Sequence, residues 1–334
     1  MRIETPYLMF LGNAPDQLAA KTAQGIVHWR PEHCVGQLRL CGCGADLKLP
    51  DMTLEEAAKA GAKTVIIGVA NRGGVLSPDW LDLLVRGLEL GLDLASGLHR
   101  RLIDEPRLVE AAKKFGRQLF DVRHPTQVFA VGSGEKRSGR RLLAVGTDCS
   151  VGKMYTTLAL EKEMKARGLM ADFRATGQTG IFIAGSGVSI DAVVADFISG
   201  AVEWLSPANE PDHWDLIEGQ GSLFHASYAG VSLGLLHGAQ ADALVLCHEP
   251  TRDHMRGLPH YKLPDLKTCM DANLAAGRLT NPAARFVGIA INTAALDETA
   301  ATDLLRHTEA EFGLPTVDPV RTGVAGIVDH LLDI

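Results

Sequence analysis

Hydrophobic residues along this chain occur in short runs that alternate with amphipathic stretches, a pattern typical of βαβ units. In the first part of the chain, the runs that predict strands are 7–11, 35–40, 64–69 and 118–122. The stretches that predict helices are 15–27, 54–60, 80–90 and 106–115. The β-branched content of 64–69 is that of a buried strand. The chain therefore begins with an α/β domain.

The apolar pattern stops at residues 133–140, where glycine, serine and charged residues follow one another. Such a stretch, without an apolar period, indicates a linker. Beyond it the alternation resumes, with predicted strands at 142–145, 172–175, 216–218, 243–248 and 286–292 and predicted helices at 153–167, 191–205 and 297–312. We predict an N-terminal α/β domain over 1–132 and a C-terminal domain over 141–334. The C-terminal domain is expected to be a doubly wound, mostly parallel sheet with helices on both faces.

Composition narrows the class of protein. A chain of 334 residues, 46% hydrophobic and 22% charged, suits two globular domains. The net charge of −7 argues against a nucleic-acid binder, although it leaves room for a local basic pocket. No stretch approaches the roughly 18 apolar residues of a membrane span, and the N-terminus lacks the regions of a signal peptide. We expect a cytoplasmic protein without a membrane partner.

The cysteines do not indicate a metal centre. Six cysteines in a chain of this length show no disulfide framework. Cys41 and Cys43, with His33 and Cys34 upstream, lack the second pair of ligands that a zinc site normally shows. We expect ordinary thiols and no bound metal.

The strongest motif is a glycine-rich loop between a predicted strand and a predicted helix. It reads Gly146-Thr147-Asp148-Cys149-Ser150-Val151-Gly152-Lys153. The glycines let the backbone curl so that successive N–H groups point at one anion. The helix N-terminus adds a partial positive charge, and Lys153 adds a full one. We assign residues 146–154 to the phosphates of a nucleotide-like molecule.

The residue after the lysine separates phosphate binding from phosphoryl transfer. A nucleotide-hydrolysing loop has Ser or Thr there, whose hydroxyl ligates Mg²⁺. Here the residue is Met154, and magnesium prefers oxygen to a thioether. Thr156 and Thr157 come later on the helix and are expected to point elsewhere. The loop therefore keeps a phosphate cradle without one of the usual metal ligands.

Two further strand ends fit the same kind of fold. Glu218 ends a predicted strand and is followed by Gly219-Gln220-Gly221, where such folds place a second acidic group beside the phosphates. The predicted strand 286–292 ends in Asn292, whose amide can pair with a purine edge. An ordinary turn explains either feature as well.

These residues resemble dethiobiotin synthetase and its P-loop relatives. The sequence is more closely similar to a family with an N-terminal Rossmann-like domain and a C-terminal P-loop NTPase-like domain. The motifs that carry the similarity are G-T-D-C-S-V-G-K-M at 146–154, T-G-Q-T-G at 176–180, I-D-A-V at 190–193, D-F at 196–197 and E-G-Q-G-S at 218–222. Met154 belongs to this pattern, which covers nearly the whole chain. The family includes the DgcN-type D-glutamate N-acetyltransferases, which transfer acetyl from acetyl-CoA to the amine of D-glutamate.

The resemblance implies acetyl-CoA as co-substrate, its phosphates on the P-loop and its adenine near Asn292. Acetyl transfer needs a base for the amine, and Asp148, Glu218 and His225 are the candidates because all follow strand ends. The carboxylates of D-glutamate favour arginine. Arg72 and Arg174 are the candidates, and Gln178 and Thr179 are placed with them at the substrate. We also expect a homo-oligomer.

Two other functions stay open. One is an ATP-dependent ligase or kinase similar to dethiobiotin synthetase, against which Met154 argues. The other is a nucleotide-binding regulator without catalysis, which needs no basic substrate pocket.

Overall fold

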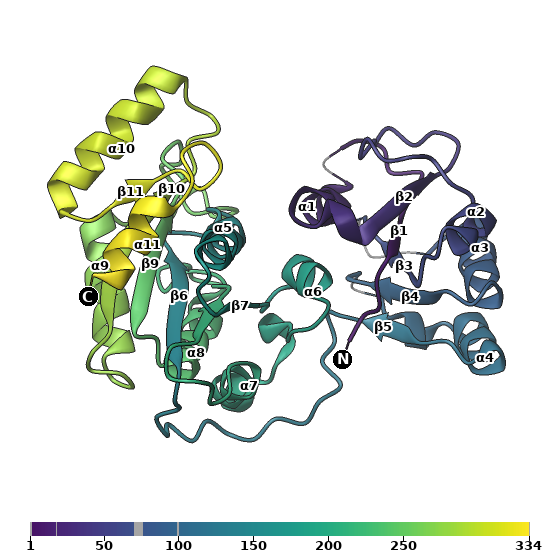
Figure 1. Cartoon of the computed structure of the whole chain (residues 1–334), viewed down its shortest axis with the longest axis horizontal. Coiled ribbons are helices and arrows are strands. Elements are labelled where there is room, and N and C mark those ends of the chain that lie inside the picture. The colour runs from purple at the N-terminus through teal and green to yellow at the C-terminus, as the bar shows by residue number, and fades with distance from the viewer. Residues whose placement is uncertain (1, 18, 70–75, 99, 334) are drawn as a thin grey trace. The chain divides into compact units, whose positions relative to one another are not determined.

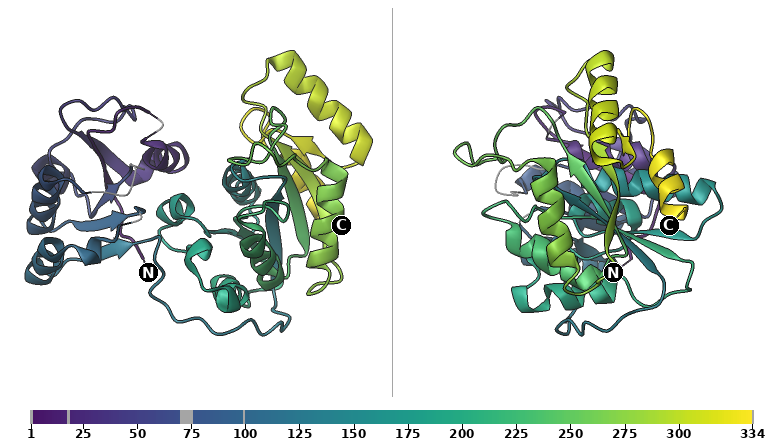
Figure 2. Two further views of the ribbon diagram at one scale, coloured as in Figure 1. Left: turned by 180° about the vertical axis from the view of Figure 1, so that it is seen from behind. Right: turned by 90° about the vertical axis from the view of Figure 1, so that its left-hand side faces the viewer.

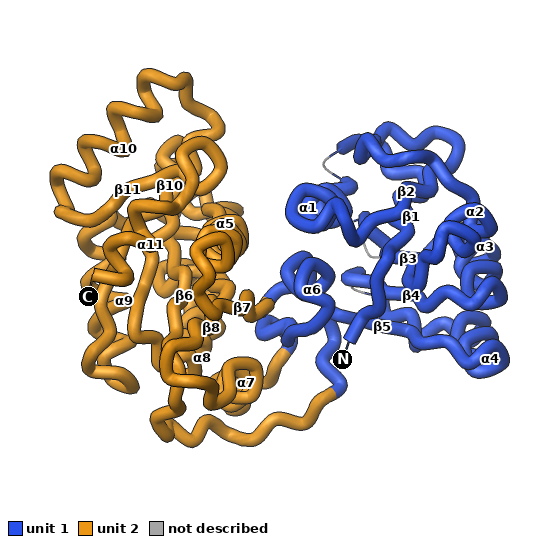
Figure 3. The backbone as a smooth tube through the Cα atoms, viewed as in Figure 1, with its two compact units in different colours: residues 1–126, 177–192 blue, residues 127–176, 193–334 orange. Residues whose placement is uncertain are grey.

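The computed structural model describes residues 2–17, 19–69, 76–98 and 100–333 (Figure 1). The chain divides into two compact units (Figure 3). Unit 1 comprises Met1–Thr126 and Gly177–Ala192, and unit 2 comprises Gln127–Thr176 and Val193–Ile334. Within the described residues, no helix is both long enough and apolar enough to cross a membrane.

Unit 1 is built on a five-stranded sheet in the order β2-β1-β3-β4-β5, in which every pair is parallel. Its strands are β1 (Tyr7–Gly12), β2 (Cys34–Arg39), β3 (Thr64–Ile67), β4 (Asp93–Ser96) and β5 (Leu119–Asp121). Its helices are α1 (Lys21–Trp29), α2 (Leu54–Lys59), α3 (Pro78–Glu89), α4 (Pro106–Phe115) and α6 (Gln178–Ala184). The sheet has the Rossmann-like α/β character expected from the sequence.

The core of unit 1 lies along its central strands. All residues of β1 and β3 are buried, as expected for parallel strands covered on both faces. The ring of Trp80 on α3 meets Phe10 edge-on, with centroids 5.1 Å apart. Strand β4 was not expected from the sequence, because only its two central residues, Leu94 and Ala95, are apolar.

Unit 2 is a six-stranded parallel sheet in the order β11-β10-β9-β6-β8-β7. Its strands are β6 (Arg140–Gly146), β7 (Ala171–Arg174), β8 (Trp214–Ile217), β9 (Ala243–His248), β10 (Arg285–Ile291) and β11 (Thr316–Val317). Its helices are α5 (Lys153–Ala166), α7 (Ile198–Leu205), α8 (Ala229–Ala239), α9 (Leu266–Gly277), α10 (Glu298–Phe312) and α11 (Ala325–Leu332). Helices α5 and α11 pack together on one face, while α7, α8 and α9 pack together on the other (Figure 2). The predicted doubly wound sheet is confirmed.

Helix α8 of unit 2 was not predicted from the sequence pattern, and its glycines explain why. It contains Gly230, Gly234 and Gly238, and glycine lowers helix propensity. A Cβ on Gly238 would lie 2.5 Å from the carbonyl oxygen of Ser199 on α7. The small residues therefore let α7 and α8 pack closely. The stabilisation that this packing provides cannot be read from the pattern of the sequence. The helix expected at 191–205 begins only at Ile198, after two short turns.

The stretch predicted as a linker, 133–140, is attached to unit 2. The carboxylate of Glu203 accepts hydrogen bonds from the backbone N–H groups of Ser133 and Gly134, at 2.9 Å and 3.0 Å. The ammonium of Lys136 lies 2.9 Å from a carboxylate oxygen of Asp242. This stretch is therefore ordered against the domain that follows it.

Residues 177–192 group with unit 1, although the sequence analysis places them in the C-terminal domain. The hydroxyl of Tyr7 donates to the carbonyl of Phe182 at 3.3 Å, and the N–H of Ile3 donates to the carbonyl of Gly185 at 2.9 Å. A single cut at 133–140 misses this return of the chain, because sequence distance alone does not show which sheet a short helix covers.

Candidate functional site

The glycine-rich loop leaves the carboxyl end of β6, a central strand of unit 2, and leads into α5. Ligands of open parallel sheets bind at this edge. Ser150 and Gly152 have φ values of 53° and 102°, so the backbone curls through the left-handed region. Left-handed residues of this kind are typical of loops whose backbone N–H groups bind an anion.

Lys153 is enclosed by the loop that it follows. Its side chain is only 6% exposed, and Nζ donates to the carbonyl oxygen of Asp148 at 2.8 Å. Across the described residues, no carboxylate lies within ion-pair distance of Nζ. Burial lowers the pKa of the Lys153 ammonium. A buried cation without a paired anion is costly, so this site is electrostatically suited to binding one.

The threonines of α5 bond back to their own helix. Thr156 Oγ1 donates to the carbonyl of Gly152 at 3.1 Å, and Thr157 Oγ1 donates to the carbonyl of Lys153 at 2.7 Å. The expectation that both side chains point away from the phosphates agrees with these contacts. Met154 occupies the position where a magnesium-binding loop has a hydroxyl.

Asp148 has a fully buried carboxylate with three donors on it. Oδ1 accepts from the N–H of Cys149 at 2.6 Å. Oδ2 accepts from the N–H of Arg256 at 2.8 Å and from the guanidinium of Arg252 at 3.0 Å. The side chain therefore ties the loop to a segment about a hundred residues away in sequence.

His225 is also engaged at both ring nitrogens. Nδ1 accepts from the N–H of Ser227 at 3.2 Å, and Nε2 lies 3.1 Å from the carbonyl oxygen of Arg256. These partners assign the proton to Nε2, which donates to that carbonyl. The ring stacks on Tyr228 with centroids 4.6 Å apart. In this arrangement the imidazole has no unpaired nitrogen to take a proton.

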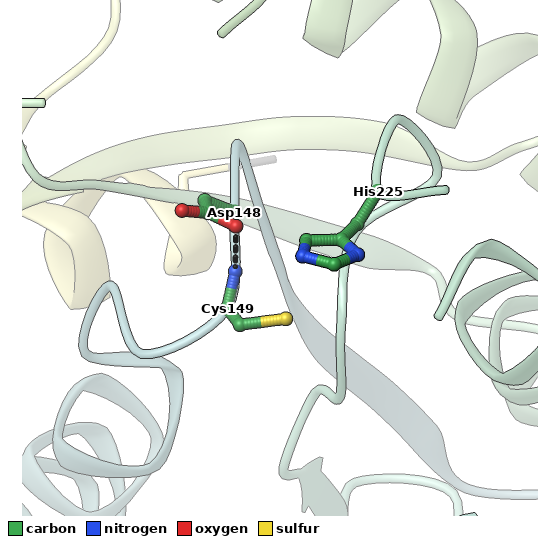
Figure 4. Close-up of side chains that lie close together, drawn as sticks. All are labelled: Asp148, Cys149 and His225. Atoms are coloured by element: carbon green, nitrogen blue, oxygen red, sulfur yellow. Dashed lines mark hydrogen bonds between the residues drawn. The ribbon is translucent and has the colours of Figure 1, made fainter. Parts of the chain in front are cut away.

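Asp148, Cys149 and His225 converge at the loop (Figure 4), with one ligand-type atom from each within 4.8 Å of the others. A metal ion there would have to displace the donors on Asp148 and the partners of His225. It would also need the thiolate of Cys149, whereas burial raises the pKa of that thiol. The donor set is poorly suited to a metal, and the absence of a metal stays a prediction.

Glu218 lies beside the loop, as the strand order implies. Strand β8 neighbours β6, and Glu218 follows its last residue. Its Oε2 accepts from the N–H of Thr176 at 2.9 Å, and the side chain is 5% exposed. A Cβ on Gly219 would lie 2.9 Å from Cδ of Lys153, so this segment abuts the lysine.

Two arginines at the loop were not recognised in the sequence. The guanidinium of Arg252 donates to the carbonyls of Cys149 and Ser150 at 2.7 Å and 2.9 Å, and it pairs with Glu249 at 2.9 Å. The guanidinium of Arg256 donates to the hydroxyl of Ser150. Both come from the segment after β9, the strand paired with β6. The spacing Arg-x-x-x-Arg after a buried strand was the available signal.

His248 is a third residue that the sequence analysis missed. It ends β9, and its Nδ1 lies 2.9 Å from the hydroxyl of Thr147 in the loop. Burial lowers the pKa of His248, which keeps the imidazole neutral near pH 7. Its position at the end of a strand next to β6 was the signal for it.

The remaining predicted residues are engaged in other contacts, belong to unit 1 or lie outside the described residues. The guanidinium of Arg174 forms an ion pair with the buried carboxylate of Asp215, at 2.7 Å and 2.8 Å. Asn292 uses its side-chain oxygen in its own turn, accepting from the N–H of Ala294 at 3.2 Å. Gln178 and Thr179 belong to unit 1 on helix α6, and Arg72 lies outside the described residues.

The fold and the loop together define a two-domain α/β protein with a Rossmann-like N-terminal domain and a P-loop C-terminal domain. The P-loop domain of the DUF1611 family, described as a domain of unknown function, matches residues 128–328. The Rossmann-like N-terminal domain of the same family matches residues 38–125. The chain belongs to the DUF1611 family.

Its relatives carry a more specific name. It is 59% identical over 98% of its length to a D-glutamate N-acetyltransferase from Tritonibacter scottomollicae, of which it covers 99%. It is 52% identical over 99% of its length to a D-glutamate N-acetyltransferase from Pseudoalteromonas, of which it covers 100%. A crystal structure of a DUF1611 family protein from Anabaena variabilis is 32% identical, with a TM-score of 0.86 over 99% of this chain and 100% of that one. The resemblance to an acyltransferase family is confirmed.

Proposed function

We propose that this protein transfers the acetyl group of acetyl-CoA to the amine of D-glutamate, with the CoA phosphates held by residues 146–153. The acceptor follows from the names of the two relatives at 59% and 52% identity. The observation that carries the donor is the buried ammonium of Lys153, which lacks a carboxylate partner among the described residues. Coenzyme A has a pyrophosphate and a 3′-phosphate, which are suitable anions for it.

The reaction needs a neutral amine and a leaving thiolate. The ammonium of D-glutamate gives a proton to a base, and the free amine then attacks the carbonyl carbon of the thioester. A C–N bond forms and the C–S bond breaks, so that the sulfur of CoA leaves as a thiolate and takes up the second proton that the attacking nitrogen loses. Donors around the carbonyl oxygen stabilise the charge that develops there. No phosphoryl group moves, so Met154 in place of a magnesium-binding hydroxyl is compatible with this chemistry.

His248 is the side chain at the loop best suited to act as the base. Of the bases predicted from the sequence, Asp148 and His225 already have partners at the atoms that would take the proton, and Oε2 of Glu218 accepts from the N–H of Thr176. The imidazole of His248 is bonded at Nδ1 and has a pKa below its ordinary value, so it is unprotonated near neutral pH. A base in that state is ready to accept a proton from an ammonium.

The acceptor's carboxylates require cationic partners. Arg72, Gln178 and Thr179 stay predictions for this part of the site. Arg174 is less suited to it, because Asp215 already neutralises its guanidinium. The cytoplasmic location and the homo-oligomeric state also stay predictions.

A thiol-release assay tests the proposed reaction. Acetyl-CoA with D-glutamate should give free CoA and N-acetyl-D-glutamate in the absence of ATP and Mg²⁺, and L-glutamate is the matched control acceptor. Mass spectrometry identifies the product. If turnover requires ATP and Mg²⁺, the ligase or kinase function replaces this one.

A further inference from the structure

The segment after β9, residues 249–263, is a fixed element that contacts the phosphate loop. Within it, the N–H of Met255 donates to the carbonyl of Tyr261 at 2.8 Å, and the N–H of Leu263 donates to the carbonyl of Asp253 at 3.1 Å. The side chain of Met255 is only 2% exposed and anchors the turn. The side chains that this segment places at the phosphate loop are therefore held by a fixed backbone.

Two buried side chains hold the backbone of Arg256 from both sides. The carboxylate of Asp148 accepts from its N–H at 2.8 Å, and Nε2 of His225 donates to its carbonyl at 3.1 Å. Asp148 comes from the phosphate loop, and His225 from the loop after β8. Both side chains are at most 2% exposed, so these contacts are shielded from water. The backbone of Arg256, from which its side chain extends, is thus held in place by two elements.

The guanidinium of Arg256 differs in charge balance from its neighbour Arg252. Arg252 pairs with Asp148 at 3.0 Å and with Glu249 at 2.9 Å, so its charge is neutralised. Arg256 donates to the neutral hydroxyl of Ser150, a residue of the phosphate loop. No carboxylate among the described residues forms an ion pair with Arg256. Arg256 therefore brings an unneutralised and exposed cation to the loop.

We propose that Arg256 binds a phosphate of the ligand held by the loop, and that Asp148 and His225 position it through its backbone. A guanidinium offers two parallel N–H groups that match phosphate oxygens, and a phosphate is a stronger acceptor than the hydroxyl of Ser150. The inference rests on the proposed function, because it takes the phosphate to be that of acetyl-CoA. In it, Asp148 and His225 are positioning residues and take no proton from the substrate.

The direct test is calorimetry of acetyl-CoA binding to the full chain with Arg256→Met. We expect Kd to rise about tenfold, as for the loss of one charge-assisted contact, with the KM for D-glutamate unchanged. Arg140→Met is the matched control, since Arg140 is an exposed arginine at the amino end of β6, opposite the loop. Its Kd should equal that of the wild type. A raised KM for D-glutamate with unchanged acetyl-CoA affinity would overturn the proposal.

Truncated donors identify the phosphate. Acetylpantetheine has no phosphate of coenzyme A that the loop could hold, so Arg256→Met should not change the rate of transfer from it. With acetyl-dephospho-CoA, loss of the Arg256→Met effect assigns the contact to the 3′-phosphate, and its persistence assigns it to the pyrophosphate. An equal loss with acetylpantetheine would contradict phosphate binding.

A double-mutant cycle tests the positioning role. Asp148→Asn should raise the Kd for acetyl-CoA, but it should add little in the Arg256→Met background, because both changes remove one contact. His225→Gln offers the same cycle if Asp148→Asn does not fold. Fully additive effects would contradict positioning.

Measurements on the wild type distinguish failure of the proposed function from failure of the assignment of Arg256. If it neither binds acetyl-CoA nor releases CoA with D-glutamate, the proposed function fails. If it does both, and Arg256→Met behaves like Arg140→Met, only the assignment of Arg256 fails.

Discussion

At the scale of single residues, His248 is the titratable group whose environment best fits a base. Burial lowers its pKa, with Glu249 raising it and Arg252 lowering it by smaller amounts. The neutral form accepts a proton, so the rate should fall as the pH drops through the pKa of His248 in the folded protein. This fall in rate is the acid limb of the pH–rate profile. Because the pKa of His248 is lowered, the limb should lie below the ordinary histidine pKa of about 6.5.

Replacing His248 should remove this limb. In His248→Gln we expect kcat at neutral pH to fall roughly a hundredfold, and the remaining rate to lose its acid limb. Thiol release measured over about pH 5 to 8 checks both effects. His307→Gln is the matched control, because His307 is exposed on α10. A pH profile of His248→Gln that keeps the wild-type limb would exclude His248 as the base.

The same shift has a consequence for stability. The folded protein binds a proton at His248 less readily than the unfolded chain, whose histidine titrates near pH 6.5. Its contribution to stability is complete above that pH and is lost as the pH falls toward the lower folded pKa. Lowering the pH should therefore reduce both the stability of the folded protein and its activity.

The sequence located Asp148, Glu218 and His225 near the loop but not the contacts that each one makes. Proximity was predictable, because neighbouring parallel strands end at one edge of the sheet. The contacts depend on Arg252 and Arg256, which come from a segment without a recognised motif. The hydrogen bonds of Asp148 to this segment span 104 and 108 residues, and no local sequence pattern indicates them.

At the scale of secondary-structure elements, the pairing of β7 with β8 explains Arg174. Asp172 and Asp215 are register partners across this pair, and Arg174 reaches the carboxylates of both, at 3.8 Å and 2.7 Å. The carboxyl group of Asp215 is 2% exposed and also accepts from the hydroxyl of Ser206 at 2.5 Å. Arg174 therefore neutralises a buried acid at the edge of the sheet.

Removing that arginine should affect stability more than substrate binding. Arg174→Met leaves Asp215 without its main cation, and we expect a loss of roughly 3 kcal/mol in the free energy of unfolding. Arg306→Met, which breaks an ion pair with side chains 79% and 59% exposed, should cost less than about 1 kcal/mol. Urea denaturation measures both. A raised KM for D-glutamate with unchanged stability would instead support the acceptor role predicted from the sequence.

Elements with a strong apolar period were predictable, whereas those defined by packing were not. Strand β9 is a continuous apolar run, and its predicted bounds, 243–248, are those observed. Helix α6 belongs to unit 1 although it lies between strands of unit 2 in sequence. Its seven residues, Gln178–Ala184, are too few for a helical period to be read from them.

At the scale of the whole molecule, an acidic chain must concentrate positive charge where it binds a polyanion. The net charge is −7, yet Lys153, Arg252 and Arg256 all lie at the phosphate loop. Of these, Lys153 and Arg256 have no carboxylate partner among the described residues. Both project from unit 2, so this unit carries the charges proposed for the CoA phosphates.

The most direct test of the account is calorimetry of acetyl-CoA binding to the full chain without magnesium, comparing the wild type with Lys153→Met. Losing the buried cation should raise Kd roughly tenfold to a hundredfold while the fold persists, since no carboxylate among the described residues is left unpaired. Met154→Thr is the control, and it should bind acetyl-CoA as the wild type does and acquire no magnesium requirement. Unchanged acetyl-CoA affinity in Lys153→Met would contradict the claim that this loop holds the coenzyme.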